Sequence, residues 1–244
     1  MTSTYTGWPA GRLVAFNAET TGIDVECDRI VSAAIVTVGG GQGPEEIRSL
    51  LDPGVEIPAA ATEIHGITTE QVRSQGQAAQ EAIEEITARL AAHMANGTPL
   101  VVFNARFGLT VLDRECRRYG LVPLADRLPR SELVPVVDPL VIDKEMARYR
   151  RGSRKLPDLC RHWHVSHQAG HDAVADAFAA ARLAWRLGTV FPRIGQLEPR
   201  GLHLLQIGWA ERQAIGLQDY LRRTDPNARV DSAWPCIPPA AEGA

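Results

Sequence analysis

The sequence lacks the features that would place the chain in a membrane or an oxidising compartment. No apolar run approaches the roughly 20 residues that a membrane-spanning helix needs. The first residues, MTSTYTGWPAGR, lack the basic and then apolar stretch that is typical of a signal sequence. The four cysteines are widely spaced and form no CxxC pair. We therefore expect a cytoplasmic protein with reduced thiols and no membrane partner.

The chain also has little net charge, and it contains no internal repeat or low-complexity tract. Its 244 residues carry a formal charge of −3, and 45% of them are hydrophobic. So small a net charge argues against a protein that coats nucleic acid nonspecifically. It does not exclude a nuclease, because the carboxylates of a metal site would offset a local basic rim.

Hydrophobic patterns predict strands early in the chain and alternating strands and helices later. The expected strands lie at 12–16, 30–38, 47–51, 100–103 and 134–137. The expected helices lie at 83–94, 109–119, 140–149, 156–164, 173–187 and 202–221. The segment 53–69 is expected to be irregular. This order predicts an α/β fold in which helices flank a mixed five-stranded sheet.

The character of the sequence changes after residue 190. We expect one domain over 1–190 and a C-terminal helical extension with a proline-containing tail over 191–244. Leu202, Leu205 and Trp209 recur on one face of the predicted helix. Such a stripe favours packing against the main domain over a partner site.

Polar residues follow the ends of several predicted elements, and two such places suggest chemistry. Asn17 and Glu19 follow the first buried strand. Asp172 is the expected N-cap of a helix in which Asp176 lies about one turn from the start, while His171 stays on the preceding loop. A carboxylate beside a movable histidine suits a metal ligand next to a general base. A capping carboxylate followed by a solvated one is the alternative at this point.

Three short motifs occur in order along the chain. They are FNAETTG at 16–22, FNARFG at 103–108 and HDAVADA at 171–177. These segments resemble the motifs F-D-x-E-T-T-G, H-N-A-x-F-D and H-D-A-x-x-D-A of the DEDDh, or DnaQ-like, 3′–5′ exonucleases. The family includes the proofreading epsilon subunit of bacterial DNA polymerase III. The resemblance covers about residues 10–190 and includes IHGIT at 64–68.

The resemblance implies a ribonuclease H-like fold and a site in which four carboxylates hold two divalent cations, Mg²⁺ or Mn²⁺. The cations activate a water and stabilise charge as a phosphodiester is cut. Glu19, His171 and Asp176 carry over as catalytic residues, with Glu19 and Asp176 as metal ligands and His171 as general base. The residues that the resemblance places beside the terminal nucleotide are Thr20, Thr21, His65 and Asn104.

Two positions depart from the family pattern. Asn17 stands where the family has its first aspartate, and Gly108 stands where the second motif has one. Asn17 still offers a carbonyl oxygen as a weak metal ligand, whereas Gly108 offers no side chain. The site would therefore have two carboxylates, whereas the family has four. We expect weakened metal binding, with one ion or none. Losing such ligands commonly costs orders of magnitude in rate.

Three interpretations stay open. The first is an impaired 3′–5′ exonuclease that acts on the 3′ end of single-stranded DNA or RNA. The second is an inactive pseudo-exonuclease that binds nucleic acid or a nucleotide, and the third is a redeployed site with different chemistry. The retained His171 favours surviving chemistry, while Asn17 and Gly108 favour a binder. The sequence leaves open whether the replacements are natural and whether a polymerase or other protein partner exists.

Two further clusters are ambiguous. The basic run over 148–155 is equally consistent with phosphate contacts and with a solvated helix end. One cysteine and four histidines lie within 160–171, but their spacing matches no zinc-ligand pattern. A surface-exposed, histidine-rich loop is the favoured interpretation of this segment.

Overall fold

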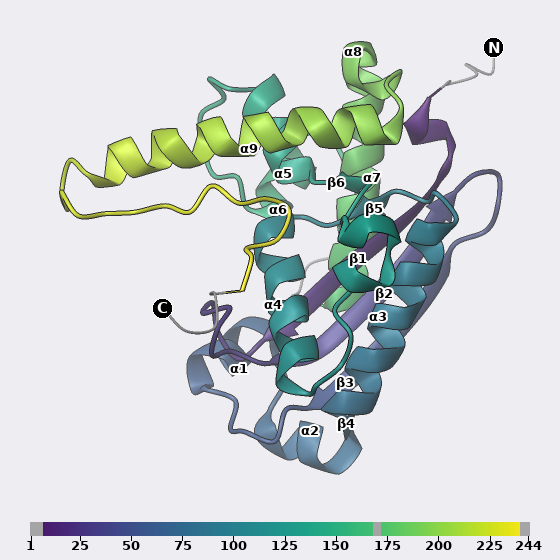
Figure 1. Cartoon of the computed structure of the whole chain (residues 1–244), viewed down its shortest axis with the longest axis vertical. Coiled ribbons are helices and arrows are strands. Elements are labelled where there is room, and N and C mark those ends of the chain that lie inside the picture. The colour runs from purple at the N-terminus through teal and green to yellow at the C-terminus, as the bar shows by residue number, and fades with distance from the viewer. Residues whose placement is uncertain (1–6, 168–171, 240–244) are drawn as a thin grey trace.

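A computed structural model describes residues 7–167 and 172–239 of the chain (Figure 1). Its sheet has the order β4-β3-β2-β1-β5-β6. The strands are β1 (Arg12–Thr20), β2 (Ile30–Gly39), β3 (Glu45–Asp52), β4 (Gln77–Ala78), β5 (Leu100–Val101) and β6 (Val136–Val137). The first three strands form an antiparallel meander, and β5 and β6 continue the sheet parallel to β1.

The predicted α/β fold with a mixed sheet is confirmed, but the prediction of five strands is wrong by one. β4 is the additional strand, and it pairs in parallel with the end of β3. Because β4 has only two residues, Gln77 and Ala78, it shows no alternating pattern that a sequence analysis can detect.

The helices cover most of the remaining chain. They are α1 (Ala59–His65), α2 (Thr69–Gln75), α3 (Ala79–Ala95), α4 (Ala105–Arg118), α5 (Pro139–Met146), α6 (Leu156–His162), α7 (Ala173–Val190), α8 (Pro192–Gly195) and α9 (Pro199–Leu221). Short 3₁₀ turns occur at Trp8–Ala10, Ala125–Arg127 and Pro129–Ser131. None of the described helices combines the length and apolar character needed to cross a membrane.

Helix α1 corrects the prediction that 53–69 is irregular. Only Ala61 is buried within it, so the helix has no apolar stripe by which its period could be recognised. Ala61 packs in a small cluster with Val31 of β2 and with Val72 of α2. Helix α1 therefore depends on packing against neighbouring elements and not on an apolar stripe of its own.

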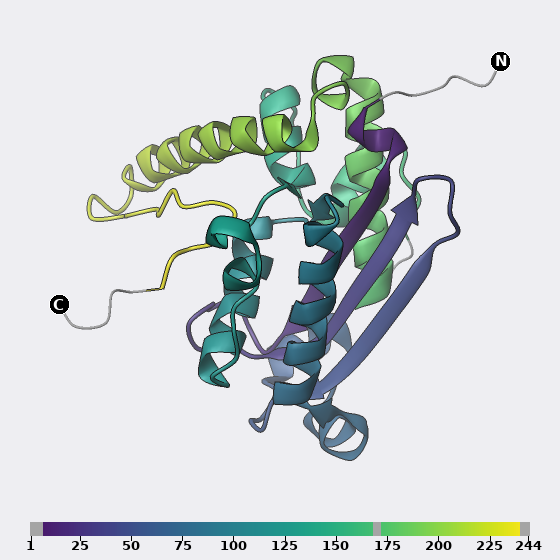
Figure 2. The same cartoon turned by 45° about the vertical axis from the view of Figure 1, so that its right-hand side comes forward.

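Helices cover both faces of the sheet. Helix α7 packs along β1 and β2 on one face, while α3 and α4 lie on the opposite face (Figure 2). The buried positions of α7 include many alanines, such as Ala177, Ala180 and Ala184. Their small side chains let the helix backbone approach the sheet closely, which brings the first turn of α7 near the end of β1.

Helix α9 lies against β6, the edge strand of the sheet. The Gln206 amide donates to the carbonyl of Val136 (2.9 Å) and accepts from the N–H of Asp138 (2.7 Å). Nδ1 of His203 accepts from the N–H of Val136 (3.2 Å). Burial lowers the pKa of His203 to about 4, so its ring stays neutral and Nδ1 can accept. Two helical side chains thus satisfy a strand edge that would otherwise be unpaired.

The buried side of α9 differs from the predicted stripe. Leu202 and Trp209 are buried as expected, but Leu205 is 45% exposed. The residues facing the domain are Leu202, His203, Gln206 and Trp209. The polar residues of this face point inward because they bond to backbone groups at the edge of a strand. An apolar pattern in the sequence does not show that such bonds are needed.

Candidate active site

The end of β1 carries the first part of the site. Residues 13–16 are buried and apolar, which fixes the strand in the sheet. Side chains at alternate strand positions point to the same face, so Asn17 and Glu19 lie on one side. Glu19 is only 9% exposed, and Asn17 Nδ2 lies 3.5 Å from Glu19 Oε1. Asn17 therefore supplies an amide donor beside the Glu19 carboxylate.

Glu19 has an unusual electrostatic environment. Burial, together with the negative charges of Asp176 and Asp172, raises its pKa from 4.5 to about 7, although the hydrogen bond from the Asn17 amide acts in the opposite direction. Within 7–167 and 172–239, no arginine or lysine forms an ion pair with Glu19. A buried carboxylate near other carboxylates, without a protein cation, is typical of a functional site.

The first turn of α7 supplies the second carboxylate. Asp172 is the N-cap, and its side chain accepts from the N–H of Ala175 (2.9 Å), which confirms the predicted cap. Arg48 of β3 forms an ion pair with Asp172, with Nη1 2.5 Å from Oδ2. Asp176 follows one turn later and is half-buried. The sheet and the helix cap together fix where Asp176 stands relative to Glu19.

A histidine does contact Asp176, but it is His167. Its Nε2 lies 2.7 Å from Asp176 Oδ1, and both side chains are largely buried. This role of His167 was not predicted, because a contact between a loop and a helix nine residues apart leaves no periodic signal in the sequence. The predicted general base, His171, lies outside the described residues, so its role stays a prediction.

The predicted nucleotide-binding residues Thr20 and Thr21 follow Glu19 directly. The Thr20 hydroxyl donates to the carbonyl of Gly22 (2.6 Å). The Thr21 hydroxyl is buried, donates to Asp28 (2.7 Å) and accepts from the N–H of Arg29 (2.9 Å). Both hydroxyls thus stabilise the turn after β1, and their contact with a nucleotide stays a prediction.

Asn104 and His65 lie at the same end of the sheet. Parallel pairing of Val14 with Leu100 places Asn104 level with the last residues of β1. Asn104 is exposed and adopts a left-handed backbone (φ 59°), which asparagine tolerates better than most residues. His65 ends α1, and its Nδ1 accepts from the N–H of Ile67 (3.1 Å). The arrangement is compatible with the predicted substrate contacts and leaves them untested.

Gly108 lies in the first turns of α4, close to the sheet. A Cβ atom at this position would lie 3.1 Å from Cγ1 of Val102, so a larger residue requires a small local shift. The nearby carboxylate of Asp138 does not replace the missing one. Asp138 is fully buried, and its oxygens accept from the N–H groups of Asn104, Ala105 and Leu140 at 2.9–3.1 Å. It organises the start of α4 and α5 instead.

The side chains available as metal ligands suit one hard divalent ion better than two. Across the described part of the chain, no group of three or more His, Cys, Asp or Glu side chains is arranged to hold a metal, and this includes the described part of the histidine-rich segment. Mg²⁺ is often bound by one or two carboxylates, with waters and phosphate oxygens completing its shell. Glu19 and Asp176 meet that minimum, with the Asn17 carbonyl as a neutral addition.

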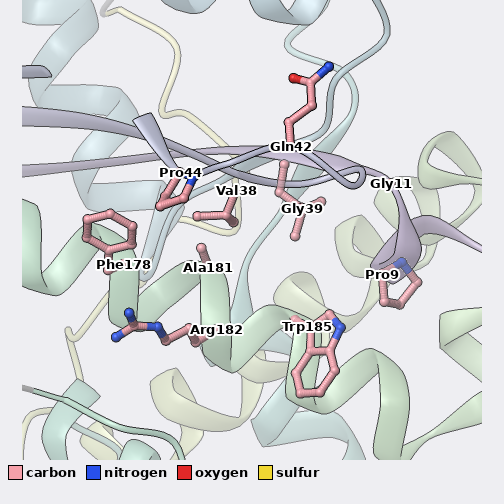
Figure 3. A pocket seen from close by; sticks show the side chains of 11 residues that line it. Pro9, Gly11, Val38, Gly39, Gln42, Pro44, Phe178, Ala181, Arg182 and Trp185 are labelled. Atoms are coloured by element: carbon pink, nitrogen blue, oxygen red, sulfur yellow. The ribbon is translucent and has the colours of Figure 1, made fainter. Parts of the chain in front are cut away.

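A separate apolar pocket of about 330 Å³ lies between α7 and the β1–β2 ribbon (Figure 3). Phe178, Trp185 and Pro9 line it, together with Gln42 and Pro44 of the β2–β3 turn. None of the predicted site residues that the structure describes contributes to this pocket. It is therefore distinct from the candidate active site.

The sequence model of the exonuclease family RNase_T matches residues 14–184. The chain belongs to this exonuclease family. The match begins within β1 and ends within α7, so it contains the described parts of the candidate site. The resemblance to DEDDh, DnaQ-like exonucleases is thereby confirmed at the level of the family.

Known proteins are similar to this chain over most of its length. The chain is 26% identical over 174 residues to the PolC-type DNA polymerase III of Lacticaseibacillus paracasei, a match that covers 71% of this chain and 11% of the polymerase. A structure of exonuclease I has a TM-score of 0.62 at 21% identity and covers 75% of this chain and 42% of that one. A zinc-bound complex of Escherichia coli exonuclease I with single-stranded DNA has a TM-score of 0.60 at 21% identity, with coverages of 75% and 41%.

These similarities confirm the ribonuclease H-like exonuclease fold. The segment that matches spans about a tenth of the polymerase and less than half of exonuclease I. The roles of the individual site residues, the boundary at residue 190 and the effect of the two replacements stay predictions.

Proposed function

We propose that the chain is a 3′–5′ exonuclease homologue that hydrolyses phosphodiester bonds at nucleic-acid 3′ ends and is impaired because Asn17 and Gly108 replace metal-site aspartates. The observation that carries this proposal is the buried carboxylate of Glu19 at the end of β1, with Asp176 of α7 near it. Both residues lie within the family match, and no arginine or lysine of the described residues forms an ion pair with either; Asp176 is contacted by the His167 ring.

Each residue of the proposed site has a separate role. Mg²⁺ or Mn²⁺, when bound, supplies positive charge that stabilises the phosphodiester as it is cut. Glu19 and Asp176 hold that ion, and Asn17 orients Glu19 through its amide. Thr20, His65 and Asn104 line the approach to the terminal nucleotide. His171 takes the proton of the attacking water, as the family resemblance implies.

A single strand with a free 3′ end is the proposed substrate. This choice is supported by the fold shared with exonuclease I, whose solved complexes contain single-stranded DNA. The PolC-type relatives support a polymerase as the proposed protein partner. The second candidate function is a noncatalytic binder of nucleic acid or nucleotide, which the shortage of carboxylates in the described site favours.

The experiment that tests this proposal is hydrolysis of a 3′-labelled single-stranded oligonucleotide with Mg²⁺ or Mn²⁺. Asn17→Asp combined with Gly108→Asp is expected to cut from the 3′ end at least a hundredfold faster than the parent, because two anionic ligands are restored. Adding His171→Ala to this variant is expected to remove most of the gain.

A matched control separates charge from packing at position 108. Asn17→Asp with Gly108→Ala introduces the same contact with Val102 but no carboxylate. It is expected to stay close to the rate of Asn17→Asp alone. If the doubly reverted protein is folded yet inert on both DNA and RNA, the exonuclease proposal is wrong, and the binder becomes the better description.

A further inference from the structure

A second pocket lies between α5, α9 and the tail that follows α9. Its volume is about 490 Å³, within the range of small-molecule sites. It begins at Asn104 and extends over α5 towards Leu217 of α9 and Trp234 of the tail. Helix α9 and the tail lie beyond residue 184, where the family match ends. The pocket is therefore built partly from elements that the exonuclease family model does not include.

Four cationic side chains are among the residues that line this α5–α9 pocket. Arg148 and Arg154 are already engaged, because Arg148 pairs with Glu145 and Arg154 forms an ion pair with the buried Asp143. These two arginines add positive potential, but their groups are largely committed to protein partners. The donors available to a ligand have to come from other residues.

Lys144 is the first such donor. It is half-buried in the pocket wall, and it forms no hydrogen bond or ion pair with any residue of the described ranges. Burial lowers the pKa of its ammonium group, which the charge of Asp138 offsets only in part. A half-buried ammonium without a partner is unfavourable, and an anion in the pocket would stabilise it.

Arg106 is the second donor. Its Nε is buried and has no hydrogen-bond partner, and its closest acidic contact is Asp231 of the tail, with Nη2 3.9 Å from Oδ1. Asp231 is half exposed, so this ion pair is weak. The carboxylate of Asp138, which also lines the pocket, is occupied by backbone N–H groups. The two unsatisfied donors in this wall are thus cationic.

The rest of the wall is largely apolar. The apolar residues among its lining include Leu140 and Val141 of α5, Leu217 of α9 and Trp234 of the tail. Inorganic phosphate would leave most of the volume empty, whereas a base and sugar would cover these side chains. Two cationic donors beside an apolar wall suit a phosphate attached to a flat, apolar group.

We propose that the α5–α9 pocket binds a nucleoside phosphate, with Lys144 and Arg106 holding the phosphate and the wall formed by α5 and α9 covering the base. The phosphate belongs either to a free mononucleotide or to the end of a strand. Binding here requires no divalent ion and no residue of the proposed metal site, so it does not depend on the proposed nuclease activity.

The test is calorimetric titration of the full chain in EDTA with thymidine 5′-monophosphate, thymidine, inorganic phosphate and a twelve-residue oligothymidylate. We expect the monophosphate to bind with a stoichiometry near one, and Lys144→Met and Arg106→Gln each to weaken binding about tenfold or more. Lys155→Met is the matched control, because Lys144 and Lys155 are the only lysines of the chain and Lys155 is exposed. It is expected to bind like the parent.

Acetylation of lysine provides a second measurement that does not need a variant. Thymidine 5′-monophosphate is expected to protect Lys144 and leave Lys155 unprotected, as read by mass spectrometry. Protection of Lys144 by the oligonucleotide alone supports the phosphate site and identifies a strand as the source. The proposal is overturned if thymidine binds as tightly as its monophosphate, if inorganic phosphate matches it, or if no phosphate compound depends on Lys144. These outcomes are independent of whether the reverted enzyme cuts DNA.

Discussion

At the scale of single residues, the buried and acidic surroundings of Glu19 favour the binding of a cation. Its neighbours are an amide from Asn17 and the carboxylates of Asp176 and Asp172. The family's aspartate at position 17 would add another negative charge, which divalent ions balance. With asparagine there, the proposed site is expected to carry less negative charge and to attract divalent ions less strongly.

Glu19→Gln tests this description without an activity assay. The folded protein holds the Glu19 proton up to about pH 7, whereas the unfolded chain releases it near 4.5. The parent therefore loses stability as the pH rises from 4.5 through 7, by on the order of 3 kcal/mol. The variant lacks this loss, so its free energy of unfolding relative to the parent is expected to rise by that amount between pH 4.5 and pH 8.

Urea denaturation in EDTA at the two pH values measures the difference. Added Mn²⁺ is expected to stabilise the parent at pH 8 and to have less effect on Glu19→Gln, because the ion replaces the proton. Parallel stability profiles for the two proteins would mean that Glu19 has an ordinary pKa and is not held in a buried acidic cluster.

At the scale of elements, the start of α7 determines where Asp176 lies. Asp172 caps the helix and also pairs with Arg48 of β3, so one side chain connects the helix to the sheet. Capping satisfies a free N–H group of the first turn, while an ion pair at this exposure contributes little. The cap is therefore the stronger of the two interactions.

Substitutions at Asp172 separate these contributions. Asp172→Ala removes both and is expected to destabilise the protein by about 1 kcal/mol. Asp172→Asn keeps a capping oxygen and loses only the ion pair, so its cost is expected to be less than half of that. Chemical denaturation at pH 7 measures both values. Equal losses in the two variants would show that the ion pair, rather than the cap, anchors α7.

At the scale of the whole molecule, the C-terminal extension completes the sheet. Helix α9 satisfies the edge of β6 through Gln206 and His203, and the tail returns to α4, where Arg114 donates to the carbonyls of Ile237 and Pro238 (both 3.1 Å). Helix α9 and the tail thus contribute to the stability of the sheet, and they also supply part of the lining of the α5–α9 pocket.

Gln206→Leu is expected to destabilise the protein by about 3 kcal/mol. The substitution leaves the N–H of Asp138 and the carbonyl of Val136 buried without their partner, and each such group costs about 1–3 kcal/mol. Gln213→Leu on the same helix is the control. Its side chain makes one bond, to the carbonyl of Val141 (3.1 Å), so a loss of about 1 kcal/mol or less is expected. Equal effects in thermal or urea unfolding would contradict the role of α9 as an edge cover.

Local sequence patterns were sufficient to predict the fold class, most of the long helices and strands, and the family. Runs such as 30–38 are apolar and β-branched, and such runs form buried strands in almost any context. The motifs around Glu19 and Asp176 depend on local spacing, so they could be recognised without coordinates. The cap at Asp172 is also local and was predicted correctly.

Tertiary structure alone decided the features that depend on distant partners. The sixth strand β4 is two residues long, and α1 has no apolar stripe, so each depends on its neighbours. The contact of His167 with Asp176, and the inward turn of Gln206 towards β6, also join separate elements. Hydrophobic periodicity in a sequence reports which residues are buried. The position of a buried polar side chain depends instead on its hydrogen-bond partner. That partner comes from a distant part of the sequence, and only folding brings it close.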